Sequence, residues 1–326
     1  LELSAVARLL WGKGWYGRRV HALPQLAVFA RLTRGSMIEA LRAYPAFLIG
    51  TAAVLGLLVG SFLNVVSLRL PAMMAAGWKL EARSILELAE EAPAEPPLTL
   101  WSPPSRCPHC NSTIRPWHNV PVFGWLWLRG RCADCGAPIS PQYPLLEAAS
   151  GVLCGICAWH LGWGPQLAAA LPLTWALLVL TVIDLREQLL PDSITLPALW
   201  AGLLLSCLGL FTTPVPAICG AALGYLSLWS IYHLYRLATG KEGMGAGDFK
   251  LLAALGAWFG AAALPLIILL SSLVGSIVGL CGMVGLSLIL FRGHGRDVPI
   301  SFGPYLAGAG WLTLVWGDSL RALIPL

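Results

Sequence analysis

The sequence predicts an all-α polytopic membrane protein, because charged residues are scarce and long apolar segments recur along the chain. Of the 326 residues, 21 are Lys or Arg and 16 are Asp or Glu, which together make up 11%. An ordinary soluble domain carries about 25% charged residues. Hydrophobic residues make up 57% of the chain, and the mean hydropathy is +0.73. This composition excludes a disordered chain, a coiled coil and most cytosolic enzymes.

About eight transmembrane helices are expected, since a helix needs about 20 mostly apolar residues to cross a bilayer. A first helix over residues 45–66 precedes a polar segment over residues 67–142, and seven further helices form a membrane core over residues 143–326. Those seven are placed near 144–162, 165–183, 195–212, 216–236, 250–263, 264–291 and 302–317. The block at 250–263 is short and rich in Gly and Ala, so a broken or re-entrant helix is the alternative there.

The distribution of Lys and Arg predicts the orientation of these helices. Segment 67–142 and the loops at 236–250 and 292–296 are basic, whereas the loops near 163–164, 213–215 and 263–264 contain no Lys or Arg. Basic loops face the cytoplasm, so the polar segment is expected on the cytoplasmic side. The net charge of +5 is spread between apolar blocks without a basic stripe, and no nucleic-acid partner is expected.

Residues 1–44 form a basic N-terminal extension whose role is left open. They contain seven Lys or Arg and two Glu, yet eight crossings send them to the face opposite the polar segment. An interfacial amphipathic helix and a misjudged first span are both compatible with this conflict. A cleaved signal peptide is a poorer interpretation, because the basic stretch before the apolar run is too long.

Four of the nine cysteines form two Cys-x2-Cys pairs inside the polar segment, Cys107 with Cys110 and Cys132 with Cys135. Two such pairs about 20 residues apart are typical of a tetrahedral zinc site, which is closed and normally structural. Disulfides are less compatible with a cytoplasmic segment, and a thioredoxin-like redox pair is a further alternative. The other five lie in apolar blocks and are expected to pack between helices: Cys154, Cys157, Cys207, Cys219 and Cys281.

Ionisable groups at the ends of membrane helices are costly, so each is a functional candidate. Five carboxylates qualify: Glu147, Asp184, Asp192, Asp248 and Asp318. Asp184 ends a long apolar run, and Asp248 follows two glycines, Gly245 and Gly247, that would let a substrate backbone approach. The orientation places Asp184 and Asp248 at the cytoplasmic ends of their helices. If they share a site, one keeps its proton while the other polarises water, as in aspartic proteases.

Structural interpretations compete with a catalytic role for these acids. Asp192 is expected to cap the helix that follows it, and Asp248 could cap the block at 250–263. Asp184 could pair with Arg186 or Lys250. Glu147 begins a span and could bind a neighbouring arginine or a helix dipole, and Asp318 is expected to be solvated.

Together these motifs resemble one family, the bacterial type IV prepilin peptidases. The resemblance covers nearly the whole chain after about residue 45 and depends on the order of its motifs. They are GSFLNVVSLRLP (60–71), SRCPHCNSTIRPWHNVPVFGWLWLRGRCADCGAPISPQYPLLE (105–147), IDLREQLLPDSITLP (183–197), GMGAGDFKLLAALGAWFG (243–260) and ISFGPYLAGAG (300–310).

The resemblance implies an inner-membrane aspartic protease of the GxGD class that is also an N-methyltransferase. It would remove the leader of type IV prepilins or type II secretion pseudopilins after a Gly at the cytoplasmic face. It would then methylate the new N-terminal residue, usually Phe, with S-adenosylmethionine. In the family's pattern Asp184 and Asp248 are the catalytic pair, and Cys107, Cys110, Cys132 and Cys135 bind zinc. Asp192, Gly245, Gly247 and Glu147 are assigned to substrate binding or support.

Three alternatives stay open at this point. A peptidase-only member would lack methyl transfer, and the chain indeed shows no glycine-rich nucleotide motif after a strand. A zinc-ribbon transporter or scaffold would use the carboxylates along an ion path. A presenilin-like intramembrane protease shares GxGD but lacks the cysteine pairs. The sequence leaves the oligomeric state undetermined.

Overall fold

The computed structural model describes residues 37–87, 98–241, 243–283 and 301–323. The chain divides into two units, residues 1–48 and residues 49–326. In the first unit, residues 37–43 are helical, and a second helix begins at Pro45. Most of the basic extension over residues 1–44, whose role the sequence leaves open, lies outside the described residues.

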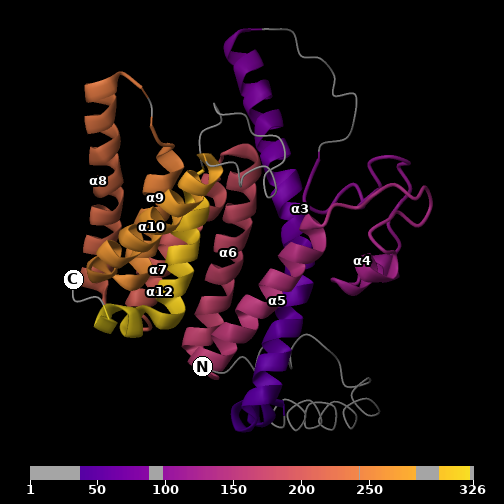
Figure 1. The fold of residues 1–326 in the computed structure, drawn as a ribbon, viewed down its shortest axis with the longest axis horizontal. Helices are drawn as coiled ribbons and strands as arrows, with labels where there is room; N and C mark the ends of the chain where they lie inside the picture. The colour runs from indigo at the N-terminus through magenta and orange to yellow at the C-terminus, as the bar shows by residue number, and fades with distance from the viewer. Residues whose placement is uncertain (1–36, 88–97, 242, 284–300, 324–326) are drawn as a thin grey trace, which may run out of the picture. The chain divides into compact units, whose positions relative to one another are not determined.

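The described part of the chain is helical and contains no β-strand, only two isolated β-bridges in the polar segment, which confirms the predicted fold class (Figure 1). The α-helices are α3 (Pro45–Ile85), α4 (Phe123–Trp127), α5 (Gln142–Leu161), α6 (Pro165–Glu187), α7 (Asp192–Ser206), α8 (Pro214–Thr239), α9 (Ala246–Phe259), α10 (Leu264–Met283) and α12 (Gly303–Leu323). Two 3-10 turns, Pro116–Asn119 and Ala261–Ala263, precede α4 and α10.

Within the described residues, five helical segments are long and apolar enough to cross a membrane, so the chain is a multi-pass membrane protein. They are α3, α5, α6, α8 and the segment Ala261–Val278 that includes most of α10. The other three expected spans correspond to α7, α9 and α12. Of these, α7 and α9 have only 15 and 14 residues, fewer than the roughly 20 that a straight crossing requires.

Helix α3 is longer than the first predicted span. It has 41 residues and continues 19 positions beyond Val66 with Pro71 inside it. The residues after Pro71 are mostly Ala, Met, Leu, Lys, Glu and Arg, which favour helix in water as well as in lipid. The end of the apolar run therefore marks the expected end of the span and not the end of the helix.

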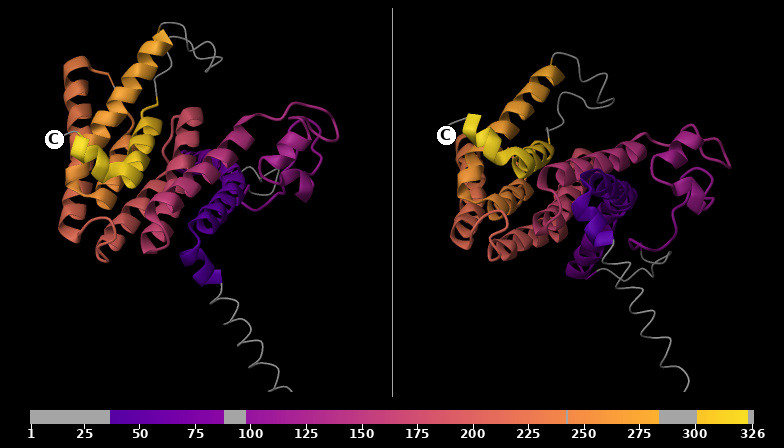
Figure 2. Two further views of the ribbon diagram at one scale, coloured as in Figure 1. Left: turned by 60° about the horizontal axis from the view of Figure 1, so that its bottom comes forward. Right: turned by 90° about the horizontal axis from the view of Figure 1, so that it is seen from below.

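Helix α9 packs against α7, α8 and α12, within the helix bundle that Figure 2 shows from two further sides. All but one of its residues from Asp248 to Phe259 are buried. Close approach to α8 depends on glycine: a Cβ on Gly220 would collide with the backbone of Gly256, and one on Gly224 would lie 2.7 Å from the carbonyl oxygen of Leu252. Small residues at such positions allow membrane helices to pack backbone against backbone.

Helices α3 and α5 make a second close contact of the same kind. A Cβ on Gly56 would lie 2.6 Å from the carbonyl oxygen of Ser150, and one on Gly60 would lie 2.9 Å from the Cα of Glu147. The Ser150 hydroxyl donates a hydrogen bond of 2.6 Å to the carbonyl of Gly56. Beside this contact, α3, α5 and α6 share a hydrophobic cluster of Leu63, Val66, Leu146, Val179 and Ile183.

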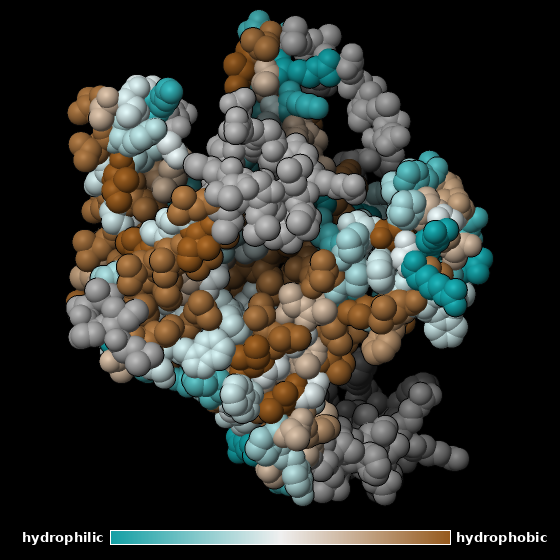
Figure 3. All heavy atoms as spheres, in the orientation of Figure 1, coloured by the Kyte–Doolittle hydropathy of each residue, from teal (hydrophilic) through white to brown (hydrophobic). Residues whose placement is uncertain are grey.

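Figure 3 shows how hydrophobic and hydrophilic side chains are distributed on one face of the protein. Hydrophobic side chains cover most of the visible face of the helices, whereas hydrophilic side chains gather around α4 and the loops beside it. Large apolar residues are exposed along α8 and α10, among them Leu223, Leu226 and Leu273. Lipid accounts for such exposure in a membrane protein, because hydrocarbon solvates apolar side chains.

We predict that Gly220→Ala destabilises the protein, because the added methyl group overlaps the backbone of α9 at Gly256. Overpacking of this kind costs about 1–3 kcal/mol, so thermal unfolding in detergent should begin several degrees lower. Gly50→Ala is the matched control, since a Cβ at Gly50 meets nothing within 4 Å. Equal unfolding temperatures for the two variants would contradict the close α8–α9 contact.

Candidate active site and metal centre

Asp184 lies in the last turn of α6, which ends at Gln188 in the left-handed conformation. Its side chain is buried, with 5% of the residue exposed. Two residues just before and at the start of α12 hold it. The Ser301 hydroxyl donates to the backbone carbonyl of Asp184 at 2.9 Å, and the Gly303 N–H donates to the carboxylate. A Cβ on Gly303 would lie 2.6 Å from Asp184 Oδ2, so this position accepts only glycine without rearrangement.

Asp248 lies in the first turn of α9 and is also buried, with 7% of the residue exposed. The N-cap residue is Gly245, whose N–H donates to the Asp248 carboxylate while its carbonyl accepts from the Asp248 N–H at 3.2 Å. An acid at the third helical position that reaches back to the N-cap N–H is one half of a capping box, and glycine has no side chain to form the other half. The alternative that Asp248 itself is the N-cap residue is wrong.

Leu190 connects the two acidic segments. Its side chain lies so close to Gly247 that a Cβ there would be 2.7 Å from Leu190 Cβ. The same side chain lies 3.2 Å from the position of a Cβ on Gly303, which is itself in contact with Asp184. Asp184, Leu190, Gly247 and Gly303 therefore converge at one place, although 119 positions separate the first and last of them in sequence.

The two carboxylates interact electrostatically, and neither forms an ion pair within the described residues. Asp184 Oδ2 and Asp248 Oδ1 are both buried without a hydrogen-bond partner there. Two neighbouring carboxyl groups without a cation cannot both ionise cheaply, so a catalytic pair formed by them would hold one proton. Such a pair can deprotonate a water molecule with one member while the other donates a proton to a carbonyl oxygen.

Asp192 does not cap α7, contrary to expectation. Pro191 is the N-cap residue, and Asp192 is the first residue of the helix. Both oxygens of the Asp192 carboxylate accept from Lys250 Nζ at 2.7 Å, so Lys250 pairs with Asp192 and not with Asp184. Asp318 is fully exposed, as expected for a solvated residue, and its Oδ1 lies 3.5 Å from a guanidinium nitrogen of Arg321.

Glu147, in the second turn of α5, forms no ion pair with an arginine within the described residues. Its Oε2 accepts the N–H of Val122 at 2.7 Å, and Val122 is the N-cap residue of α4. Glu147 is buried, with 7% of the residue exposed. A carboxylate at a helix N-terminus is favourable, so the expected helix contact exists, but it is to α4 and not to α5.

The four cysteines of the polar segment form one cluster, with all four sulfur atoms within 4.8 Å of one another. The two pairs have the same local geometry. Asn111 and Gly136, which follow the second cysteine of each pair, have φ angles of 56° and 72°. In each pair the N–H of the first cysteine donates to a carbonyl five residues later, from Cys107 to Ser112 and from Cys132 to Ala137.

This cluster fits a tetrahedral metal ion. Metal–sulfur bonds of about 2.3 Å at tetrahedral angles separate the sulfurs by about 3.8 Å. Cys107 and Cys135 sulfurs lie 3.8 Å apart, and those of Cys110 and Cys132 lie 4.0 Å apart. Hydrogen bonds from Ser112 lower the pKa of Cys110 to about 6, which favours its thiolate, whereas burial and the neighbouring cysteines raise the pKa of Cys135 to about 12. All four are free cysteines, so the structure contains neither of the alternative disulfides.

The remaining cysteines divide into two groups. Cys154 and Cys157 are fully buried, as expected for packing residues. Cys207 and Cys219 are exposed, so the expectation that they pack between helices is wrong. The side chain of Cys281 lies outside the described residues.

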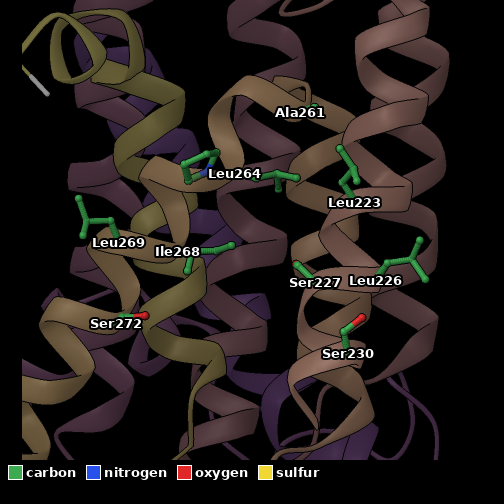
Figure 4. Close-up of a pocket in the computed structure, with 10 residues that line it drawn as sticks. Leu223, Leu226, Ser227, Ser230, Ala261, Leu264, Ile268, Leu269 and Ser272 are labelled. Carbon is green, nitrogen blue, oxygen red and sulfur yellow. The ribbon is translucent and has the colours of Figure 1, made fainter. Parts of the chain in front are cut away.

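An apolar groove of about 790 Å³ lies between α8 and α10 (Figure 4). Its lining includes Leu223 and Leu226 from α8 and Ile268 and Leu269 from α10, with three serines and no titratable side chain. A groove of this composition can accommodate hydrocarbon but offers no group for acid–base chemistry.

Three residues near the aspartates escaped sequence reasoning: Leu190, Ser301 and Gly303. Leu190 lies in an apolar run with no distinguishing pattern. Ser301 and Gly303 belong to the quoted segment 300–310, but no spacing rule connects a residue there with Asp184. Only the folded arrangement of α6 and α12 reveals the contact.

Comparison with known proteins adds independent evidence. Residues 54–161 match the family model described as the bacterial peptidase A24 N-terminal domain, and residues 171–280 match the type IV leader peptidase family. Two relatives named prepilin leader peptidase/N-methyltransferase come from Stutzerimonas stutzeri (52% identical) and Aeromonas hydrophila (51%), and each alignment covers 87% of this chain and 96% of the relative. A third, from Neisseria gonorrhoeae, is 45% identical over 84% of this chain and 92% of its own. No solved structure matches the chain.

Proposed function

The chain belongs to the type IV leader peptidase family, and from this premise we propose that it is a bifunctional enzyme of the bacterial inner membrane. It cleaves the leader of type IV prepilins or type II secretion pseudopilins after a Gly and then methylates the new N-terminal residue, usually Phe. The observation that carries the protease activity is the buried pair of Asp184 and Asp248, each with an unpartnered carboxylate oxygen.

Asp184 and Asp248 perform the cleavage as a pair that holds one proton. The ionised carboxylate accepts a proton from water while the protonated carboxyl donates its proton to the oxygen of the scissile carbonyl. Collapse of the tetrahedral adduct then breaks the C–N bond, and the leaving amine takes a proton. Gly245 and Gly247 leave room beside Asp248 for the substrate backbone.

The cleavage site lies at the cytoplasmic face of the membrane. Asp184 lies in the last turn of α6 and Asp248 in the first turn of α9, so both are at helix ends and not at mid-helix. The neighbouring loops carry Arg186, Arg236 and Lys241, the positive charge expected of cytoplasmic loops. In a substrate with a cytoplasmic leader and a hydrophobic helix in the bilayer, the junction between leader and helix would lie at the same cytoplasmic face of the membrane.

The cysteine cluster holds a structural zinc ion. Four thiolates in a closed tetrahedral set leave no open coordination position for a substrate, which is the arrangement of structural zinc sites. The methyl donor is S-adenosylmethionine, which supplies a methyl group bound to a positively charged sulfur. Transfer breaks that S–C bond and forms an N–C bond to the new amine, which loses a proton.

Asp248→Asn should reduce leader cleavage by about 10²–10⁴-fold, because an amide neither holds nor transfers the shared proton. Asp318→Asn is the matched control, since Asp318 is fully exposed. Asp192→Asn should retain substantial activity, because its ion pair with Lys250 is half exposed and such pairs contribute about 0–1 kcal/mol. The measurement is the intact mass of a Gly-Phe prepilin after incubation with purified enzyme and S-adenosylmethionine.

Two outcomes of this experiment would change the assignment. Cleavage by folded Asp248→Asn at the wild-type rate would refute the catalytic pair. Complete loss in Asp192→Asn would move the first catalytic acid to that residue. A product without its leader but also without the added mass of a methyl group would leave a peptidase only.

Gly303→Ala tests the geometry around Asp184. The new methyl group would overlap Asp184 Oδ2 and displace the carboxylate, and a displacement of about 1 Å in a catalytic group can cost about 10²-fold in rate. Gly308→Ala, in the same helix, is the control because a Cβ there meets nothing within 4 Å. Unchanged cleavage by both variants would contradict the contact between α12 and Asp184.

The metal assignment predicts about one zinc ion per chain in the purified protein. Cys107→Ser should lose most of this zinc, because three ligands bind a structural ion far more weakly than four. Cys207→Ser removes an exposed cysteine outside the cluster and should keep the full complement. Elemental analysis of both proteins decides the matter: a metal-free wild type with full activity would overturn the zinc site.

A further inference from the structure

A cavity of about 450 Å³ lies between α3, the start of α5 and the loops of the polar segment that carry the cysteine pairs. It is distinct from the aspartate pair, since neither Asp184 nor Asp248 lines it. Its lining combines apolar side chains such as Leu68 and Ile139 with the aromatic rings of Trp125 and Tyr143. Cavities of about 300–1,000 Å³ with mostly apolar walls and a few placed polar groups are typical of small-molecule sites.

The buried polar groups of this cavity are hydrogen-bond acceptors. Asn64 is only 3% exposed; its amide nitrogen donates to the Tyr143 carbonyl at 3.1 Å, and its Oδ1 has no partner within the described chain. Glu147 also lines the cavity and accepts hydrogen bonds from the Val122 N–H and the Ser61 hydroxyl, so the acceptor without a partner is Asn64 Oδ1. A buried acceptor without a donor is rare and requires an explanation. A ligand that carries N–H donors or a positive charge would provide one.

Two arginines, Arg69 and Arg106, also line the cavity. Arg69 donates to the carbonyls of Thr99 at 2.8 Å and Pro103 at 2.6 Å. These bonds fix its guanidinium group against the segment that precedes the first cysteine pair. Within the described residues neither arginine forms an ion pair with Glu147, so the Glu147 carboxylate can still pair with a cationic group of a ligand, and Arg106 with an anionic one.

We propose that this cavity binds S-adenosylmethionine and that Asn64 and Glu147 hold its cationic methionyl end. The inference rests on the proposed methyltransferase activity and assigns it a site. The ligand combines an aromatic heterocycle with an ammonium and a sulfonium group, and this combination matches a cavity with aromatic walls and two buried acceptors. The volume is sufficient for one molecule of that size.

The position of the cavity suits a product that comes from the aspartate pair. Leu63, Leu146 and Ile183 belong to one hydrophobic cluster, and they directly precede Asn64, Glu147 and Asp184 in the sequence. The proposed methyl-donor site and the proposed cleavage site therefore border the same apolar cluster. A new pilin N-terminus released at Asp184 would reach the cavity without leaving this part of the enzyme.

Binding of S-adenosylmethionine to the full-length protein in nanodiscs, measured by calorimetry without any pilin, tests the proposal. Glu147→Gln keeps an oxygen for the Val122 N–H but removes the charge, and it should weaken binding at least about tenfold. Asn64→Leu should weaken it similarly. Glu187→Gln makes the same chemical change at an exposed position and should bind as the wild type does. Zinc content and unfolding temperature are measured on each variant.

The outcomes separate this site from the wider function. If the wild type binds no S-adenosylmethionine, the methyltransferase half of the proposed function fails. If the wild type binds and both cavity variants bind equally well, the cavity assignment alone is overturned. A loss of affinity that accompanies lost zinc and a lower unfolding temperature would assign Glu147 to folding instead. If the cavity variants bind S-adenosylmethionine with unchanged affinity but show a raised KM for pilin, the cavity binds the pilin amine instead.

Discussion

An ionised carboxylate buried without a cation costs several kcal/mol, and this cost governs the centre formed by Asp184 and Asp248. Each acid lies at a helix end, where a backbone N–H, from Gly303 or Gly245, donates to it. The two basic side chains nearest in sequence, Arg186 and Lys250, bond instead to Gln142 and Asp192. No cation therefore fixes both acids in their ionised forms within the described residues, and the proposed catalytic pair could keep the one proton that hydrolysis would require.

Glycines that lie far from the two acids allow the helices that carry the proposed sites to pack closely. Helix α9 reaches the middle of the bundle because Gly220 and Gly224 of α8 let two backbones meet. On the other side, Gly56 and Gly60 bring α3 against α5, next to Glu147. The two contacts place one proposed site at the start of α9 and the other at the start of α5. The cluster around Leu146 and Ile183 connects them.

The fold class, the acidic pair and the cysteine cluster could be predicted because each has a local signal. The length of an apolar run identifies a membrane helix, and Cys-x2-Cys spacing indicates a metal site. An isolated acid at the end of a membrane helix indicates a functional candidate. Other features depend on contacts between distant segments. Nothing in the sequence shows that Lys250 bonds to Asp192, that Glu147 contacts α4, or that Gly303 faces Asp184. The length of α3 was missed for another reason, since helix propensity continues where hydropathy stops.

Leu190 lies in contact distance of both Gly247 and Gly303, and each of those glycines stands beside one of the aspartates. The segments that carry the two aspartates therefore meet across an apolar side chain from a third segment, the turn between α6 and α7. A larger or smaller residue at position 190 would change how closely the start of α9 approaches the start of α12.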